Sequence, residues 1–247
     1  MGQLDGKTAL VTGATAGIGL AAARRLADEG AHVYLTGRRQ DALDAAVASI
    51  GVTATGIRAD VSNLDDLDRV VATIGDRGLD VLFANAGGGE FAALEEITWE
   101  HYADTFNTNV GGTIFTVQKA LPLFRRGGSI ILTSSNIDTK GAASFSVYAA
   151  SKAALRSFTR SWAAELVGRD IRVNSIAPGP IATPGLRGLA PDPEGAEQLL
   201  KGLASGVPMN RLGRPEEIAD AVVFLASGAS TYMTGAEIYV DGGASQV

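Results

Sequence analysis

The chain alternates short runs of apolar residues with longer segments in which apolar residues recur every three or four positions. The short runs predict strands that are buried on both faces, and the longer segments predict amphipathic helices that cover them. The strands predicted in this way are Thr8–Val11, His32–Thr36, Thr53–Arg58, Leu79–Ala84, Ser129–Thr133, Ile171–Ile176 and Ile238–Val240. The predicted helices are Ile18–Glu29, Asp41–Ile50, Leu64–Ile74, a pair across Thr98–Phe124, Val147–Val167 and Pro215–Leu225.

Buried strands that alternate with helices indicate a parallel sheet with right-handed crossovers and helices on both faces. No linker or internal repeat interrupts the pattern, so we expect residues 1–247 to form a single α/β domain with a doubly wound sheet of seven strands. Only residues 183–210 break the alternation. They are rich in proline and glycine, with one short helical stretch near Ala196–Leu203, and a segment of this length predicts a lid over a site.

Composition restricts the chemistry that this domain can perform. With 21 lysines and arginines against 27 aspartates and glutamates, the formal net charge is −6, and the chain has no long basic run, which argues against a nucleic-acid partner. The absence of cysteine excludes disulfides, thiolate metal sites and cysteine nucleophiles, so redox chemistry would need a bound cofactor. The two histidines, His32 and His101, are too far apart in the chain to suggest a metal site.

The first residues of the chain have no basic segment followed by an apolar stretch, and no window approaches ~18 uninterrupted apolar residues. We therefore expect a cytoplasmic protein without membrane association. Glycine is unusually frequent, at 31 of 247 residues, and follows no collagen-like period. This frequency predicts that the backbone approaches another group closely somewhere in the fold.

A glycine-rich loop, Thr12–Gly19, lies between the first predicted strand and the first predicted helix. Gly13 would allow a tight turn, Gly17 would let a pyrophosphate approach bare backbone, and Gly19 would let the helix pack on the sheet. The helix N-terminus would then face the anion. This placement predicts a dinucleotide-binding loop, and the alternative is an ordinary turn in a glycine-rich protein. The loop residues expected to contact the cofactor are Gly13, Thr15, Gly17, Ile18 and Gly19.

The identity of the cofactor depends on the end of the second strand. A carboxylate there would hydrogen-bond the ribose hydroxyls of NAD and would repel the 2′-phosphate of NADP. This chain has Arg38 and Arg39 instead, and guanidinium groups offer paired donors to a phosphate. NADP is therefore favoured over NAD. The alternative is that both arginines only solvate the start of the next helix, with Asp41 or Asp44 as partners.

Two further strand ends carry residues that could contact the cofactor, because ligands bind at the carboxyl ends of strands in sheets of this kind. The third strand is followed by Asp60 and Val61, and the fourth by Asn85, Ala86 and Gly87. Taken alone, each pattern is also typical of a helix cap or a turn.

Tyr148 and Lys152 are four positions apart in a predicted helix, so both lie on one helical face. A phenol titrates near ~10, and a neighbouring cation and an oxidised nicotinamide both favour its ionised form. Tyr148 could then act as an acid or a base. The spacing alone is a weak signal, because a helical tyrosine usually packs and a helical lysine is usually solvated.

Other polar residues strengthen the hypothesis of a chemical site. Ser134 and Ser135 end the fifth strand, and Ser135 comes thirteen residues before Tyr148. Asn107 and Asn109 fall inside the predicted helical pair, where asparagine is unfavourable enough to require an explanation.

With these residues identified, the chain resembles the short-chain dehydrogenase/reductase family over essentially all 247 residues. The motifs that carry the resemblance are TGATAGIG (Thr12–Gly19), Asp60–Val61, NAG (Asn85–Gly87), Asn109 in NTNVGG, Ser135, Tyr148 with Lys152, and Pro178–Gly179 followed by Ile181 and Thr183. The resemblance implies a Rossmann-like fold, a nicotinamide cofactor and a homotetramer. It also implies a catalytic tetrad of Asn109, Ser135, Tyr148 and Lys152.

The resemblance implies a role for each member of the tetrad in carbonyl reduction. Ser135 would hydrogen-bond the substrate carbonyl, and Tyr148 would donate a proton to it. Lys152 would hold the ribose hydroxyls and lower the pKa of Tyr148, and Asn109 would fix a water that connects the lysine to solvent. Ser134 competes with Ser135, but the spacing to Tyr148 matches the family at Ser135.

The resemblance further implies that the segment Pro178–Thr183 covers the nicotinamide, with Pro178, Gly179, Ile181 and Thr183 as contacts. Ala16 departs from the family pattern, because many relatives that use NADP carry a basic residue at this position.

Within the family, the segments Phe115–Ser135 and Arg214–Gly243 are similar to bacterial NADPH-dependent secondary alcohol dehydrogenases and ketoreductases. The resemblance implies a small-molecule ketone or secondary alcohol as the substrate. The residues expected to line a mainly apolar substrate pocket are Phe91, Ser135, Ile137, Phe145, Tyr148 and Leu186.

Two alternative functions stay open at this point. A 3-oxoacyl-[acyl-carrier-protein] reductase is the first, but the acidic carrier protein would need a basic patch, which only Arg125–Arg126 or scattered arginines could supply. A nucleotide-sensing protein without chemistry is the second, and the intact tetrad argues against it.

Overall fold

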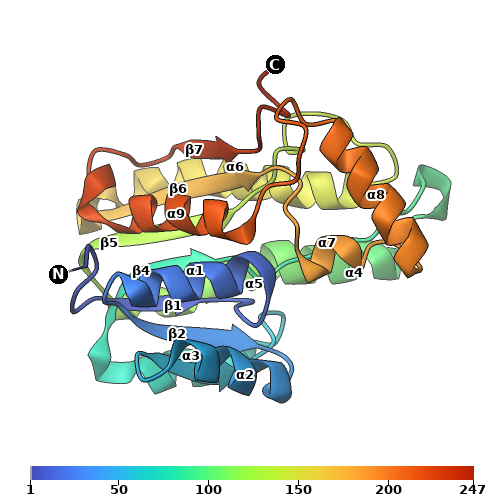
Figure 1. The fold of residues 1–247 in the computed structure, drawn as a ribbon. Coiled ribbons are helices and arrows are strands. Elements are labelled where there is room, and N and C mark those ends of the chain that lie inside the picture. The colour runs from blue at the N-terminus through green and yellow to red at the C-terminus, as the bar shows by residue number, and fades with distance from the viewer. Residues whose placement is uncertain (1) are drawn as a thin grey trace.

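The structure, a computed structural model, describes residues 2–247, which form one seven-stranded sheet covered by helices on both faces (Figure 1). The strands are β1 (Thr8–Val11), β2 (His32–Gly37), β3 (Ala54–Arg58), β4 (Leu79–Ala84), β5 (Phe124–Thr133), β6 (Ile171–Pro178) and β7 (Glu237–Val240). Every neighbouring pair is parallel, and the order across the sheet is β3-β2-β1-β4-β5-β6-β7. The expected α/β fold with a doubly wound, seven-stranded sheet is confirmed.

The helices that connect these strands are α1 (Gly17–Asp28), α2 (Gln40–Ile50), α3 (Leu64–Ile74), α4 (Trp99–Phe106), α5 (Gly112–Ala120), α6 (Ser146–Leu166), α7 (Pro184–Arg187), α8 (Pro193–Ser205) and α9 (Pro215–Ala226). Alternate strand residues point to opposite faces of the sheet. In β1, Ala9 and Val11 join a buried cluster with α1, α2 and α9, whereas Leu10 joins a second cluster with α3, α5 and α6. Both faces of the central strands are therefore covered, as their unbroken apolar runs predict.

Two boundaries differ from the sequence-based expectation. β5 begins at Phe124, which was expected to end a helix, because Phe124 pairs with Leu79 of β4 before the register shifts. The expected pair of helices across residues 98–124 is one nearly continuous segment, since a π-helical turn (Asn107–Gly111) joins α4 to α5. Asn109 thus lies in a widened turn, and such turns are frequent at functional sites.

The helical stretch expected near Ala196–Leu203 is confirmed as part of α8, but residues 183–210 also form a second helix, α7, that was not expected. Thr183 caps α7 by accepting a hydrogen bond from the backbone N–H of Leu186 (3.0 Å), and Asp192 caps α8 by accepting one from Gly195 (2.7 Å). Each cap is followed by a proline in the first helical turn, where the missing N–H costs nothing. The prolines therefore start these helices instead of preventing them.

The chain reverses its winding direction between β1 and β4, the neighbouring strands at the centre of the sheet. In open sheets of this type, ligands bind beyond the carboxyl ends of the strands at this reversal. In Figure 1, α4, α7 and α8 lie beyond this end of the sheet. Among the described residues, no helix is long and apolar enough to cross a membrane.

Candidate active site

The glycine-rich loop begins at the carboxyl end of β1 and leads directly into α1. Gly13 and Gly17 both have positive φ angles, of 63° and 54°, which L side chains rarely adopt. Ala16 precedes α1 and gives it no side-chain cap, whereas Asn63, Thr98 and Asp192 cap α3, α4 and α8. The first N–H groups of α1 therefore have no side-chain acceptor. Together with the helix dipole, they form a site that fits a pyrophosphate.

The end of β4 holds this loop in place. The hydroxyl of Thr12 accepts hydrogen bonds from the backbone N–H groups of Asn85 and Ala86, both at 3.0 Å. The Asn85 side-chain amide donates back to the carbonyl of Thr12 at 3.1 Å. A β-carbon at Gly19 would lie 2.3 Å from the carbonyl oxygen of Gly13, so only glycine permits this packing. Asn85 therefore supports the loop from behind, and Ala86 and Gly87 line the neighbouring cavity.

A cavity of about 730 Å³ extends from this loop past the ends of β2 and β3 to Asn109. The predicted cofactor contacts that line this cavity are Gly13, Thr15, Arg38, Asp60, Val61, Ala86 and Gly87. The hydroxyl of Thr36 is buried in the cavity wall without a hydrogen-bond partner among the described residues. Such an orphaned group fits a site that a polar ligand completes.

The two arginines after β2 differ in position. Arg38 lines the cavity, and no ion pair or side-chain hydrogen bond of Arg38 occurs within residues 2–247. Arg39 is the residue that precedes α2, and it is not among those that line the cavity. Asp44, a suggested partner for both, accepts a hydrogen bond from Gln40 at 2.8 Å instead. Arg38 is thus the one of the two that lines the cavity, together with Thr15 and Gly37.

Asp60 and Val61 lie at the same edge of the sheet. The carboxylate of Asp60 accepts hydrogen bonds from the backbone N–H and the hydroxyl of Ser62, at 2.9 and 2.7 Å. This carboxylate therefore closes a turn while Asp60 and Val61 also line the cavity. The turn-forming interpretation and the ligand-binding interpretation of this motif are compatible.

Tyr148 and Lys152 lie on consecutive turns of α6, as their spacing predicts. The Lys152 ammonium nitrogen is 5.4 Å from the centre of the Tyr148 ring. It donates a hydrogen bond to the carbonyl of Thr133 at the end of β5 (2.8 Å), and the lysine is only 3% exposed. Ser135 lies near the Tyr148 phenol, and its side chain acts to lower the pKa of that phenol. The fold therefore brings the serine, the phenol and the ammonium together from two elements.

Burial controls the ionisation of this pair. Burial raises the pKa of Tyr148 to about 12, and the side chain of Ser135 lowers it only in part. Burial lowers the pKa of Lys152 to about 8, because the charged ammonium is poorly solvated. The net lowering of the Tyr148 pKa that was expected from Lys152 is absent, because desolvation of the phenol outweighs any stabilisation that the ammonium gives the phenolate. Tyr148 is therefore a neutral phenol at neutral pH.

Asn109 uses all of its side-chain hydrogen-bonding groups on the chain. Its amide nitrogen donates to the carbonyl of Gly88 (2.8 Å) and to the hydroxyl of Ser151 (2.9 Å), and its oxygen accepts from the N–H of Gly88 (3.0 Å). Ser151 in turn donates to the carbonyl of Tyr148 at 2.7 Å. Asn109 therefore fixes the loop after β4 to the helix that carries the tyrosine. Ser151 was not predicted, and its place inside the motif YAASK is the signal that could have identified it.

The neighbouring serines point in different directions. The hydroxyl of Ser134 donates to the carboxylate of Asp138 (3.0 Å) and lies 3.3 Å from the carbonyl of Lys152. Ser135 is the serine whose side chain acts on the pKa of Tyr148. Its role in catalysis stays a prediction. Asp138 was not predicted, since no local pattern marks a carboxylate whose partners lie on other strands.

Three of the predicted substrate-pocket residues form an aromatic stack beside the phenol. The ring centres of Phe91 and Phe145 are 4.6 Å apart, and those of Phe145 and Tyr148 are 4.5 Å apart. Phe91 is 46% exposed, so the stack leads from the surface to the partly buried tyrosine. Ile137 and Leu186 are both partly buried, in the turn after β5 and in α7.

The segment after β6 approaches the glycine-rich loop. Pro178 ends β6, and Gly179 donates a hydrogen bond to the carbonyl of Val240 at 3.0 Å. Ile181 is buried and forms a bridge with Gly213. A β-carbon at Gly17 would lie 3.1 Å from the methyl group of Thr183, so Thr183 stands next to the start of α1.

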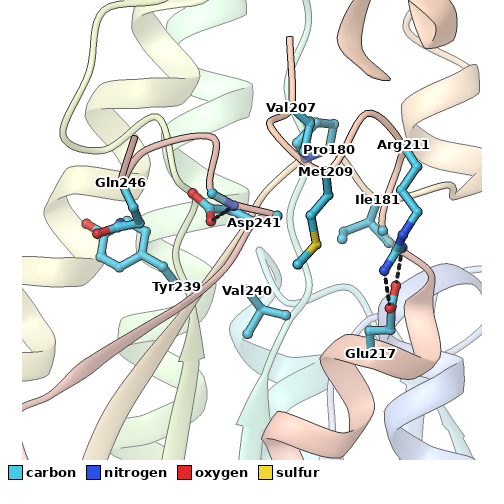
Figure 2. Close-up of a pocket in the computed structure, with 13 residues that line it drawn as sticks. Pro180, Ile181, Val207, Met209, Arg211, Glu217, Tyr239, Val240, Asp241 and Gln246 are labelled. Atoms are coloured by element: carbon cyan, nitrogen blue, oxygen red, sulfur yellow. Dashed lines mark hydrogen bonds and ion pairs between the residues drawn. The ribbon is translucent and has the colours of Figure 1, made fainter. Parts of the chain in front are cut away.

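A second cavity, of about 410 Å³, lies between the segment after β6 and the C-terminal residues (Figure 2). Arg211 and Glu217 form a two-point ion pair on one wall, and Tyr239 and Asp241 stand on the other. The side chain of Asp241 accepts hydrogen bonds from the N–H groups of Gly243 and Ser245. No member of the predicted tetrad lines this cavity.

Comparison with known proteins agrees with this geometry. A family model described as enoyl-(acyl carrier protein) reductase matches residues 13–245. The oxidoreductase asL5 of Sarocladium schorii is 47% identical over 99% of this chain and 98% of its own length. The 3-oxoacyl-[acyl-carrier-protein] reductase FabG of Vibrio harveyi is 37% identical over 98% of both chains. A solved structure of a short-chain dehydrogenase/reductase family protein superposes with a TM-score of 0.88 at 42% identity, covering 99% of this chain and all of that one. The chain is therefore an oxidoreductase that belongs to the short-chain dehydrogenase/reductase family.

Proposed function

We propose that this protein reduces a small-molecule ketone to a secondary alcohol with NADPH, and that it catalyses the reverse oxidation with NADP. The observation that carries the proposal is the cluster of Tyr148 with the buried residues Ser135 and Lys152 at the carboxyl edge of the sheet. The adjoining cavity has an arginine at the end of β2 where a carboxylate would favour NAD.

In the proposed mechanism, a bound NADPH supplies the hydride, and the chain positions and protonates the substrate. The hydroxyl of Ser135 donates a hydrogen bond to the carbonyl oxygen of the ketone. Tyr148 then donates its proton to the same oxygen as negative charge develops there. Because its pKa is raised to about 12, the phenol holds this proton at neutral pH until the oxygen becomes basic.

The ammonium of Lys152 stabilises the phenolate that forms when the proton leaves, and it would also hold the ribose hydroxyls of the cofactor. Both amide hydrogens of Asn109 are used within the chain, so a water connecting Lys152 to solvent would have to donate a hydrogen bond to an oxygen of this residue. The segment Pro178–Thr183 would cover the nicotinamide, and residues 183–210 would act as the lid.

Two further expectations are part of the proposal: a cytoplasmic location and a homotetramer. Support for self-association comes from large apolar side chains that are exposed on α4 and α5, with Trp99 80%, Tyr102 38% and Phe115 37% exposed. Light scattering coupled to size-exclusion chromatography would measure the mass of the assembly directly.

The central experiment is to assay the purified protein against a panel of aryl and alkyl ketones, with NADPH or NADH in excess, by the loss of nicotinamide absorbance. We expect turnover with NADPH that exceeds turnover with NADH. Tyr148→Phe serves as the inactive control. Absence of turnover with every ketone in the panel would contradict the proposal.

A 3-oxoacyl-[acyl-carrier-protein] reductase is the second candidate, favoured by the similarity to FabG of Vibrio harveyi and by the description of the matching family model. The basic patch that this activity needs is reduced, because Arg125 is engaged with Asp80 at 2.7 Å and with the carbonyl of Arg77. Comparing turnover of acyl thioesters with turnover of simple ketones distinguishes the two candidates.

A further inference from the structure

The turn that follows β5 carries Ser135, and Asp138 contacts the groups on both sides of this serine. The backbone N–H of Asp138 donates a hydrogen bond to the carbonyl oxygen of Ser135 at 3.1 Å. The carboxylate of Asp138 accepts a hydrogen bond from the buried hydroxyl of Ser134 at 3.0 Å. Asp138 therefore contacts both neighbouring serines. Its backbone N–H bonds the carbonyl of Ser135, and its carboxylate accepts from the hydroxyl of Ser134.

The carboxylate of Asp138 is itself held from the last strand of the sheet. The hydroxyl of Tyr239 lies 3.4 Å from a carboxylate oxygen of Asp138 and 3.2 Å from one of Glu237. Glu237, whose side chain is 4% exposed, accepts a hydrogen bond from Ser175 of β6 at 2.9 Å and pairs with Arg156 of α6 at 3.3 Å. Three elements of the core thus support a carboxylate beside the proposed catalytic serine.

Asp138 and Glu237 are neighbouring carboxyl groups that both contact Tyr239. Within residues 2–247, the other titratable side chain in contact with the pair is Arg156. Burial raises the pKa of Glu237, the charge of Asp138 raises it further, and hydrogen bonds from Ser175 and Ser134 lower it.

The turn has other anchors that do not involve the Asp138 side chain. The N–H of Asn136 donates to the carbonyl of Pro178 at 3.0 Å, and the hydroxyl of Ser245 donates to the carbonyl of Asn136, also at 3.0 Å. The Lys140 ammonium donates to the carbonyl of Ala244 at 2.7 Å. Removal of the Asp138 carboxylate therefore leaves the turn attached to the core and removes only the contacts with Ser134 and Tyr239.

We propose that Asp138 is a positioning residue that holds the Ser135 hydroxyl in line with Tyr148 by bracing Ser134 against the β7 side chains Tyr239 and Glu237. The inference rests on the proposed function, in which Ser135 hydrogen-bonds the substrate carbonyl. Asp138 itself touches neither substrate nor cofactor in this assignment.

The first test compares three variants of the full-length protein in ketone reduction. Asp138→Ala should lower kcat about tenfold and leave the Kd of NADPH unchanged, because the serine is displaced by a fraction of an ångström while the cofactor cavity is untouched. Asp138→Asn keeps an oxygen that accepts from Ser134 and should retain most of kcat. Lys140→Ala, on the same turn, is the matched control and should behave like the unmodified protein.

Three results would overturn the proposal: unchanged kcat in Asp138→Ala, an equal loss in Asp138→Asn, or an equal loss in Lys140→Ala. Thermal unfolding of each variant shows whether it is folded, and the Asp138→Asn comparison is informative even where Asp138→Ala is less stable.

The second test measures Asp138→Ala in a Ser135→Ala background. If Asp138 acts through the Ser135 hydroxyl, this background leaves it no hydroxyl to position. Adding Asp138→Ala to Ser135→Ala should therefore change kcat by less than about twofold. An equal tenfold loss in both backgrounds would show that Asp138 acts elsewhere. If Ser135→Ala and Tyr148→Phe keep full turnover, the proposed function fails; if both lose turnover and Asp138→Ala does not, only the role of Asp138 fails.

Discussion

The two halves of the site are built in opposite ways. Around the ends of β1 and β2, the described chain leaves groups without partners, such as the uncapped start of α1, the Thr36 hydroxyl and the Arg38 guanidinium. Around Tyr148, nearly every polar group is already paired within the chain: Asn109 with Gly88 and Ser151, and Lys152 with the carbonyl of Thr133.

In the proposed function, the first half of the site binds the cofactor and the second half carries out the chemistry. Groups without partners in the chain gain hydrogen bonds only when a ligand supplies them, so they contribute to affinity and specificity. Groups that are already paired and buried cannot reorganise, and burial has moved their pKa values far from those in water. Substitutions in the first half should therefore change cofactor binding, and substitutions in the second half should change turnover.

The largest expected effect tests the catalytic half. Tyr148→Phe removes the proposed proton donor and should lower kcat by a factor of about 100 or more, in the range of general acid loss, with little change in the Kd of NADPH. Steady-state kinetics and fluorescence titration of the cofactor measure both quantities. Tyr232→Phe, which alters a fully exposed tyrosine, is the matched control. Wild-type kcat in Tyr148→Phe would remove this residue from the mechanism.

A substitution at the end of β2 should change cofactor binding and leave kcat nearly unchanged. Arg38→Ala removes a guanidinium from the cavity wall and should raise the KM for NADPH about tenfold or more, while the KM for NADH and the value of kcat change little. Arg39→Ala is the control, because Arg39 does not line the cavity. Equal changes for the two cofactors in Arg38→Ala would contradict a 2′-phosphate contact.

A pair of adjacent glycines tests how closely the catalytic half is packed. A β-carbon at Gly89 would lie 2.5 Å from Cδ2 of Tyr148, whereas one at Gly88 would meet no atom within 4 Å. Gly89→Ala should therefore cost about 1–3 kcal/mol of unfolding free energy and lower kcat, since the phenol must move. Gly88→Ala should do neither. Urea denaturation and kcat measurements on both variants make the comparison, and identical behaviour would contradict it.

The smallest expected effect is a pH dependence. Burial lowers the pKa of Lys152 to about 8, so the ammonium is charged below that pH and loses its charge as the pH rises through it. Since the charge stabilises the developing phenolate, kcat for reduction should fall severalfold across this range. Lys152→Arg, which stays charged, should have lower activity but no decline near pH 8. A decline at the same pH in Lys152→Arg would assign it to another group.

Local pattern predicts much of the fold and part of the site. The apolar runs predict all seven strands, because a strand buried on both faces is apolar at consecutive positions. The loop Thr12–Gly19 and the helical spacing of Tyr148 and Lys152 are local for the same reason. The start of β5 at Phe124 and the helix α7 were missed, since pairing with Leu79 and capping by Thr183 override the local composition.

By itself, the sequence determined which residue types stand at the carboxyl ends of the strands and how far apart they lie along the chain, because these properties depend on neighbouring positions only. The tertiary structure alone decided that Asn85 supports the glycine-rich loop, that Asp138 is held by Tyr239 from the other end of the chain, and that Tyr148 has a raised pKa. Each of these depends on groups that approach through space from distant parts of the chain, and on the water that their packing excludes.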